Sequence, residues 1–340
     1  MENCVVVGDT HLGLSKNSDS WCNITLRLFE EIHDTCVKRN IKNVIHVGDF
    51  FHERRSLNTL TQVYAFKIAD LFDMSNINLY AIVGNHDCYY KNIIKPTSLQ
   101  IFKKYPTIKI IDEIYPLTDD ILLVPWNTPI PTKYNQQYVF GHFEIKGFQM
   151  NNRKECDKGV DPDIFKPYRR IFSGHFHMPS TKGNITYLGS PFQQTFNDVG
   201  NICGYYIFKE GELEFIQFRD CPSFIVIDTD VFFDKGVDRS DITGNIVKIK
   251  YKEDYGTTNN MKILDEIQML LPFQLYTDFS QTKIEGVEGE SEELDAPPSI
   301  IDHDDIIDEY IKKTEVPENI NKKTLVGMIM KLKEEIEGGK

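Results

Sequence analysis

Five short motifs that combine glycine with Asp, Asn or His punctuate the chain between Gly8 and His177. Each motif follows a short apolar run, which is typical of a buried strand bounded by a turn. Six of the nine histidines belong to these motifs. Because the polar residues come where strands should end, the pattern predicts a sheet that gathers them at one edge. The motifs are G-D-T-H from Gly8, G-D-F-F-H from Gly48, G-N-H-D from Gly84, G-H-F-E from Gly141 and G-H-F-H from Gly174.

The size and composition of the chain favour a globular protein of the cytoplasm. Its 340 residues are 41% hydrophobic, enough for one large domain and a smaller one. No apolar run is long enough to span a membrane, and the N-terminus enters a strand-like run, so neither a membrane segment nor a signal peptide is expected. The seven cysteines are scattered without a C-x-x-C pair, which predicts reduced thiols and argues against disulfides or a zinc ribbon.

The acidic charge is concentrated near the C-terminus. The chain carries a net charge of -13, and residues 280–340, with 8 Lys and 16 Asp or Glu, account for -8 of it. Bound divalent cations would reduce the remaining negative charge further. The overall charge therefore does not exclude a nucleic-acid substrate.

Alternating strand-like and helix-like segments in residues 1–219 predict an α/β protein with helices layered on sheet. Apolar residues at helical spacing predict helices over 26–37 and 57–72. Later runs at 185–188, 204–208 and 213–218 are typical of antiparallel strands, and K-E-G-E at 209–212 supplies a hairpin turn between the last two.

Three further segments follow the motif-bearing region. Residues 220–280 read as strand, strand, helix and strand without a motif histidine, which favours support or substrate contact over chemistry. Residues 281–302 begin with an acidic stretch poor in apolar residues, which predicts a flexible linker. Residues 303–340 contain two amphipathic helical patterns. These helices are expected to dock on a partner, or alternatively to pack back on the parent domain.

The motif residues predict a site for hard divalent cations. Carboxylate, amide and imidazole groups without a thiolate suit Mn²⁺, Mg²⁺ or Fe²⁺. Seven ligands exceed the needs of one ion, so two ions bridged by Asp49, from the middle strand of the first three, are expected. Such a pair clamps a phosphoryl group and activates water, and no G-x-S-x-G nucleophile motif is present. The predicted ligands are Asp9, His11, Asp49, Asn85, His142, His175 and His177.

Two more motif histidines are predicted to act on the substrate. His86 follows the ligand Asn85 and is expected to be the general acid or a transition-state stabiliser, oriented by Asp87. His52 is expected to contact the phosphate or to position a nucleic-acid strand. For both, packing beside the metal ligands is the alternative. His46 lies inside an apolar run and is expected to be a core histidine.

In this order the motifs resemble those of the calcineurin-like metallophosphoesterases. G-D-F-F-H-E-R and G-N-H-D depart from the G-D-x-V-D-R-G and G-N-H-E of the protein Ser/Thr phosphatases. They are similar to the DNA repair nuclease branch of SbcD and the meiotic-recombination-eleven nucleases, and to the recombination endonuclease subunits of T4-type phages. V-G-N-H-D-C-Y-Y-K-N at 83–92 and G-H-F-E-I-K-G-F at 141–148 carry the latter likeness.

This resemblance implies a four-layer α/β/β/α sandwich over 1–219, a small α/β DNA-capping domain over 220–280 and a C-terminal helical region, 303–340, that binds an ABC-type coiled-coil ATPase. It also implies Mn²⁺-dependent 3′-to-5′ exonuclease activity on duplex DNA and endonuclease activity on single strands. Family members dimerise through helices that here correspond to 57–72 and 97–104, with Leu60, Tyr64 and Leu99 as contacts. A phage-encoded member would act in the host cytoplasm.

Two other hypotheses compete with a DNA nuclease. One is another metallophosphoesterase, such as a cyclic-nucleotide or protein phosphatase, but a small-substrate enzyme needs neither a capping unit nor a docking tail. The other is a non-catalytic scaffold of the same fold. The full ligand set argues against a scaffold, because buried polar groups without partners are costly.

Overall fold

The computed structural model describes residues 3–90, 93–130, 135–150, 154–229, 239–252 and 255–279, which all belong to one compact unit, Met1–Glu285. The predicted linker (281–302) and the predicted partner-binding helices (303–340) lie outside the described residues. All seven cysteines are free thiols, as expected. In the part of the chain that the structure describes, helices are too short or too polar to cross a bilayer.

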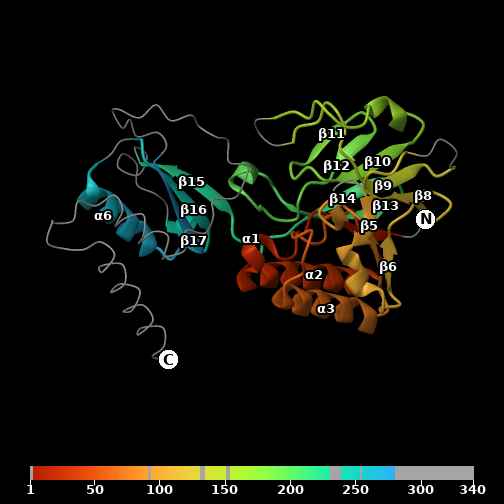
Figure 1. Cartoon of the computed structure of the whole chain (residues 1–340), viewed down its shortest axis with the longest axis horizontal. Coiled ribbons are helices and arrows are strands. Elements are labelled where there is room, and N and C mark those ends of the chain that lie inside the picture. The colour runs from red at the N-terminus through yellow and green to blue at the C-terminus, as the bar shows by residue number, and fades with distance from the viewer. Residues whose placement is uncertain are drawn as a thin grey trace. The chain divides into compact units, whose positions relative to one another are not determined.

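The first of two large sheets holds the N-terminal motifs (Figure 1). β1, β2, β3 and β6 run parallel, and the β13–β14 hairpin adds antiparallel strands at one edge. Both faces are buried, which explains the continuous apolar runs. The strand order is β14 (Glu212–Gln217), β13 (Gly204–Lys209), β1 (Cys4–Val7), β2 (Asn43–His46), β3 (Asn78–Ile82) and β6 (Ile108–Ile111).

The second sheet packs face to face with the first. Val5 of β1 belongs to the cluster under the helices, whereas Val6 packs in the cluster that joins the two sheets. The run at 185–188 was expected to be antiparallel, but β12 pairs parallel with β10 and antiparallel only with β11. The strand order is β11 (Ser180–Lys182), β12 (Ile185–Tyr187), β10 (Arg170–Gly174), β9 (Tyr138–His142), β8 (Ile121–Val124) and β7 (Tyr115–Pro116).

Helices α2 (Asp19–Arg39) and α3 (Thr59–Met74) cover the outer face of the first sheet, after the single turn α1 (Leu14–Asn17). Both long helices confirm the helical spacing of the sequence. The side chain of Asn58 caps α3 by accepting a hydrogen bond from the backbone N–H of Leu60 at 2.8 Å. The layered α/β fold is therefore as expected.

The outer face of the second sheet carries a thinner layer than the helices opposite. Its apolar cluster is covered, among the described residues, by loops and the 3-10 helix η2 (Pro162–Phe165). The segment 97–104 is likewise a 3-10 helix, η1 (Ser98–Phe102), rather than an α-helix. Leu99 on η1 is fully buried in the core of its own chain, and Tyr64 is 7% exposed. Leu99 is therefore not available to contact a second copy, and this expected dimer contact is wrong, whereas the contact expected of Tyr64 stays a prediction.

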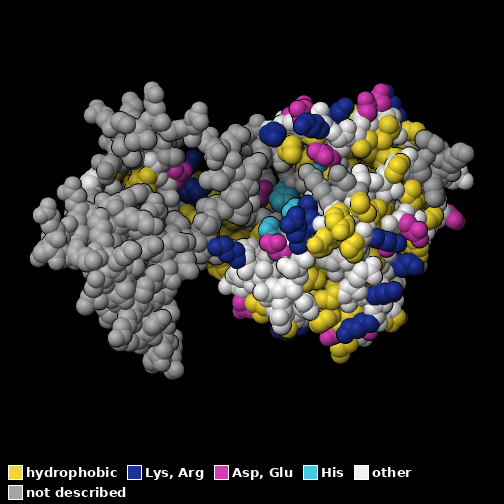
Figure 2. Space-filling view, in the orientation of Figure 1, with side chains coloured by type: hydrophobic (Ala, Val, Ile, Leu, Met, Phe, Trp, Pro, Cys, Tyr) yellow, Lys and Arg dark blue, Asp and Glu magenta, His cyan; other side chains and the backbone are white. Residues whose placement is uncertain are grey.

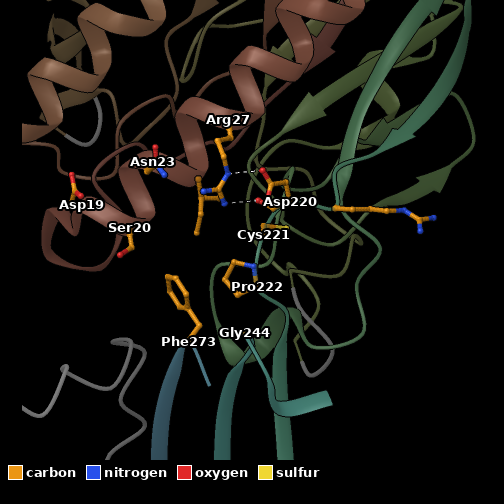
Figure 3. Close-up of a pocket in the computed structure, with 11 residues that line it drawn as sticks. Asp19, Ser20, Asn23, Arg27, Asp220, Cys221, Pro222, Gly244 and Phe273 are labelled. Atoms are coloured by element: carbon orange, nitrogen blue, oxygen red, sulfur yellow. Dashed lines mark hydrogen bonds and ion pairs between the residues drawn. The ribbon is translucent and has the colours of Figure 1, made fainter. Parts of the chain in front are cut away.

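Residues after 220 form a small parallel sheet with its own apolar cluster. The strand–strand–helix–strand order is confirmed, with the short helix α5 (Arg239–Ile242) added. Trp21 of α2 packs its ring against Phe224 and Phe273, which joins this sheet to the larger body. A cleft of about 400 Å³ lies beside this junction (Figure 3). The elements are β15 (Phe224–Asp228), β16 (Ile246–Lys250), α6 (Thr257–Gln268) and β17 (Gln274–Asp278).

Candidate metal centre

The carboxyl ends of strands from both sheets meet, and they bring all seven predicted ligands together. The ends of β1 and β10 meet where the backbone N–H of His175 donates to Asp9 Oδ1 at 2.9 Å. His142, at the end of β9, donates its Nδ1–H to the carbonyl oxygen of Val47 at 2.9 Å. The edge convergence predicted from the motifs is therefore present, and it is shared between two sheets rather than built on one.

Left-handed backbone conformations aim several of these side chains. Asp9, His11, Asp49 and His175 have φ angles of 53°, 44°, 55° and 92°. Non-glycine residues rarely adopt such angles, and each costs on the order of 1–3 kcal/mol unless its surroundings hold it. Here hydrogen bonds between the first two motif loops supply that support, from the N–H of Asp9 to Gly48 and from that of His11 to Asp49. Strain gathered at one cluster of polar groups is typical of a functional site.

Asp49, His142 and His175 form one cluster of ligand atoms within 4.8 Å of one another. His142 Nε2 lies 3.4 Å from Asp49 Oδ2 and 2.8 Å from Asn85 Oδ1. Because His142 Nδ1 already carries a proton toward a carbonyl, its Nε2 lone pair faces two oxygen acceptors when the ring is neutral. Burial alone would lower the pKa of His142, but the adjoining Asp49 carboxylate raises it to about 9. A proton thus relieves a site that has an excess of acceptors.

Asp9, His11 and His177 form the second cluster, again with ligand atoms within 4.8 Å of one another. Asp9 Oδ2 and both ring nitrogens of His11 are buried without a hydrogen-bond partner in the structure. Such orphaned groups are costly unless an ion or another partner satisfies them. Asp49 Oδ2 lies 3.7 Å from His11 Nε2 as well as close to His142, so Asp49 stands between the two clusters.

Two glycines allow this close approach. A Cβ on Gly84 would lie 2.2 Å from the backbone nitrogen of Asp49, and a Cβ on Gly48 would lie 2.3 Å from His142 Nδ1. Gly48 also has a φ of 103°, which side-chain-bearing residues rarely adopt. The glycines that precede the ligands in the motifs are therefore required by the packing of the ligands themselves.

The residues fit a pair of hard divalent cations. The two clusters offer carboxylate, amide and imidazole atoms, with no thiol among them. The buried atoms of Asp9 and His11 that have no hydrogen-bond partner are suited to bind a cation. Asp9, His11 and His177 would hold one ion. Asn85, His142 and His175 would hold the other, and Asp49 would bridge.

His86 and His52 lie beside the second cluster. His86 donates its Nδ1–H to the carbonyl oxygen of His52 at 2.9 Å, and the two rings stack with centroids 5.8 Å apart. The backbone N–H of His86 donates to Asp49 Oδ1 at 2.7 Å. The ring of His86 lies 4.8 Å from that of His11 between centroids. His86 is thus held at Nδ1 by a backbone carbonyl.

Asp87 does not orient His86, contrary to the expectation from sequence. Its carboxylate accepts hydrogen bonds from the backbone N–H groups of Gly84, Phe50 and Phe51 at 2.9, 3.3 and 3.0 Å. It therefore ties the second motif loop to the third. The carbonyl of His52 takes the orienting role instead.

Asp198 is a supporting residue that the motif analysis missed. Its Oδ2 lies 3.8 Å from His177 Nδ1, and it closes a capping box with Thr195 on the 3-10 helix η3 (Phe196–Asp198). Burial alone would lower the pKa of His177, but the neighbouring Asp198 carboxylate raises it to about 9. Carboxylates beside ligand histidines commonly fix their orientation. The T-F-N-D capping-box pattern was visible in the sequence, but not its proximity to His177.

The remaining prediction at this site concerned His46, which is a core histidine as expected. It is fully buried, contacts Thr10 Oγ1 at 3.0 Å and packs against Phe50. Burial lowers its pKa to about 3, so the ring is neutral.

Comparison with known proteins agrees with this geometry. The family model of the calcineurin-like phosphoesterases matches residues 3–204. Exonuclease subunit 1 of Enterobacteria phage T4 is 33% identical over 217 residues, 59% of this chain and 63% of that protein. The DNA double-strand break repair protein Mre11 of Sulfolobus acidocaldarius is 26% identical over 170 residues, 49% of this chain and 40% of that protein. These matches span less than two thirds of either relative.

Among solved structures, a dimetal phosphatase from Danio rerio is 9% identical, with a TM-score of 0.37 and coverage of 61% of this chain and 91% of that one. That likeness is too low to support an inference about function. The strand-end cluster defines a metal-dependent phosphoesterase. The chain belongs to the calcineurin-like phosphoesterase family, whose members use a dinuclear metal centre.

Proposed function

We propose that this chain is the nuclease subunit of a DNA-processing enzyme and uses two Mn²⁺ ions, with Mg²⁺ or Fe²⁺ as alternatives. The observation that carries the proposal is the convergence of seven carboxylate, amide and imidazole ligands beside the paired rings of His52 and His86, with atoms of Asp9 and His11 buried without a hydrogen-bond partner. The similarity to an exonuclease subunit and to a break-repair protein supports DNA as the substrate. The proposed reactions are 3′-to-5′ exonuclease cleavage of duplex DNA and endonuclease cleavage of single strands.

When bound, the two metal ions would supply an activated water and neutralise the charge on the phosphoryl group. The residues of the chain do the rest. In its doubly protonated form, His86 would give the Nε2 proton to the leaving oxygen and become a neutral ring, whose Nδ1–H still donates to the His52 carbonyl. His52, whose ring stacks with that of His86, contacts a phosphate oxygen. Asp87 ties the second motif loop to the third by accepting hydrogen bonds from the backbone N–H groups of Phe50, Phe51 and Gly84.

The assembly is also part of the proposal. The word "subunit" in the name of the phage relative supports a partner, which we take to be an ABC-type coiled-coil ATPase bound by residues 303–340. Residues 220–280 would act as a DNA-capping domain, and 281–302 as the linker. A homodimer would use α3, where Val63 is 44% exposed and Leu60 is half-buried.

A cleavage assay tests the chemistry. Purified chain with Mn²⁺ should cut labelled duplex and single-stranded DNA and also hydrolyse bis-p-nitrophenyl phosphate, and EDTA should stop all three reactions. Hydrolysis of the small ester with untouched DNA, even with the ATPase added, would instead indicate a phosphoesterase with another substrate. No hydrolysis of any substrate under any of the three metals would support the non-catalytic scaffold.

A truncation tests the partner. Removing residues 303–340 should release the ATPase in a pull-down while Mn²⁺-dependent cleavage by the isolated chain continues. Co-purification of the truncated chain with the ATPase would disprove the docking role and leave the chemistry in place.

A further inference from the structure

An exposed pair of tyrosines follows the third metal-site motif directly. Strand β4 (Cys88–Tyr90) begins one residue after Asp87 and pairs with β5 (Ile93–Thr97). Tyr89 and Tyr90 are 42% and 54% exposed, and their rings pack edge to face with centroids 4.8 Å apart. Cys88, in contrast, is fully buried and anchors the strand. The chain therefore holds an aromatic surface in fixed register with His86.

Two arginines follow the second motif in the same way. Arg54 and Arg55 come two and three residues after His52 and line, with Tyr89, a groove of about 150 Å³ whose other wall includes Pro96 and Ser98. Neither arginine forms an ion pair with a described residue. Figure 2 shows Lys or Arg and hydrophobic side chains beside the histidines on this face. In a chain of net charge -13, unpaired arginines beside an aromatic ring favour an anionic ligand with flat rings.

We propose that this groove binds single-stranded DNA next to the scissile phosphate, with one base stacked on Tyr89 and the flanking phosphates held by Arg54 and Arg55. The proposal rests on the nuclease function proposed above and names the residues that would hold its single-stranded substrate. A base inside a duplex is already stacked on both faces, so Tyr89 can engage an unpaired base or a base at a duplex end, but not a base within a duplex. Tyr90 supports the ring of Tyr89 from its edge. Both halves of the groove continue from the loops that carry His52 and His86, so a strand bound there leads into the metal centre.

Binding of a labelled single strand of thymidylates to the full chain, in EDTA to prevent cleavage, tests the groove. Tyr89→Ala should weaken binding roughly ten- to a hundredfold, and Tyr89→Leu nearly as much, because leucine fills the space without an aromatic face. Tyr89→Phe should bind like the parent. The double change Arg54→Gln and Arg55→Gln should lower the slope of log affinity against log salt by about 1.4, since each phosphate contact on a single strand contributes about 0.7. Phe215→Ala on β14, another aromatic that is 40% exposed, is the matched control and should change neither quantity.

Cleavage with Mn²⁺ separates this proposal from the function on which it rests. For Tyr89→Ala, the rate on single-stranded DNA should fall relative to the rate on bis-p-nitrophenyl phosphate. Equal cleavage of single strands by parent and Tyr89→Ala would overturn the groove alone, as would an equal loss of duplex and single-strand binding or an unchanged salt slope in the arginine variant. A parent protein that hydrolyses the ester but neither binds nor cuts DNA would overturn the nuclease function itself.

Discussion

Two sets of parallel strands in this chain end in opposite ways. β1, β2 and β3 end at glycine-containing motifs and a cluster of buried metal-ligand side chains. β15, β16 and β17 are also parallel, yet they end at Asp228, Lys250 and Asp278, and none of these strands leads into a glycine-containing motif of the kind that follows β1, β2 and β3. Beyond their ends, the rings of Tyr251 and Phe279 stack with centroids 4.2 Å apart.

The comparison shows that a parallel sheet edge alone does not make such a site. The first edge adds glycines that remove a Cβ where ligands approach, left-handed residues that turn the ligands inward, and a second sheet that closes over them. The small sheet has a carboxylate at a strand end as well, but Asp228 pairs with Lys252 at 3.1 Å and stays half-exposed. A local ion pair satisfies that carboxylate, whereas the Asp9 carboxylate keeps an unpartnered oxygen.

Replacing one aspartate near the strand ends of each sheet should give the largest difference in activity between the two sheets. Asp49→Asn should lower Mn²⁺-dependent hydrolysis by about a thousandfold or more, because a shared ligand contributes several kcal/mol of charge stabilisation through the ions. Bound metal per chain, measured by elemental analysis, should fall as well. Asp228→Asn should leave both quantities at the level of the parent. Full metal content in Asp49→Asn would show that the aspartate does not bind metal.

Replacing His86 should separate chemistry from metal binding at the first edge. His86→Ser is expected to lower cleavage by about a hundredfold or more, the usual contribution of a general acid, with metal content and DNA binding retained. His33→Gln is the matched control, since His33 on α2 contacts Ser75 Oγ at 2.7 Å away from the motifs. Loss of metal from His86→Ser would assign a structural role to His86 and contradict the proton donation.

Metal uptake at the first edge should release one proton from each of His142 and His177, because the pKa of both rings is raised to about 9. The pKa of His142 is raised from its ordinary 6.5 to about 9 in the metal-free site, so its proton stabilises that form below about 6.5 and this stabilisation is lost as pH rises through about 9. Each Mn²⁺ ion must displace one proton, and its apparent affinity should therefore rise about tenfold per pH unit between these values. Titration calorimetry in buffers of different ionisation enthalpy counts the protons. A pH-independent affinity would contradict the protonated His142 and His177.

Much of this edge could be predicted from the sequence, because strands and their terminal motifs are local signals. The convergence of the seven candidate ligands, the core position of His46 and the two covering helices all follow from residue spacing. Residue spacing did not predict that two sheets contribute to the site, because this depends on how β9 and β10 pack against β1 and β2. For the same reason, the backbone-binding role of Asp87 and the position of Asp198 beside His177 were missed.

The sequence also did not predict the thinner layer on the outer face of the second sheet or the burial of Leu99. An amphipathic stripe predicts that a face is buried but not which surface buries it. The family resemblance, and not the spacing, assigned Leu99 to a contact between copies, whereas Leu99 fills the core beneath η1. Spacing therefore predicts elements and their buried faces, and only tertiary packing distinguishes a core from an interface.

The smallest expected effect concerns the junction between the two sheets compared above. Arg27 Nε lies 2.7 Å from Asp220 Oδ2, and its other nitrogen donates to the Asp220 carbonyl (Figure 3). Because the Asp220 side chain is 65% exposed, Arg27→Ala should lower the free energy of unfolding by less than about 1 kcal/mol. Trp21→Ala, which removes a buried ring packed on Phe224 and Phe273, should cost about 3–5 kcal/mol and serves as the comparison in denaturant unfolding. Equal losses in the two variants would mean that the ion pair contributes as much as the aromatic packing to holding the sheet of β15, β16 and β17 on the larger body.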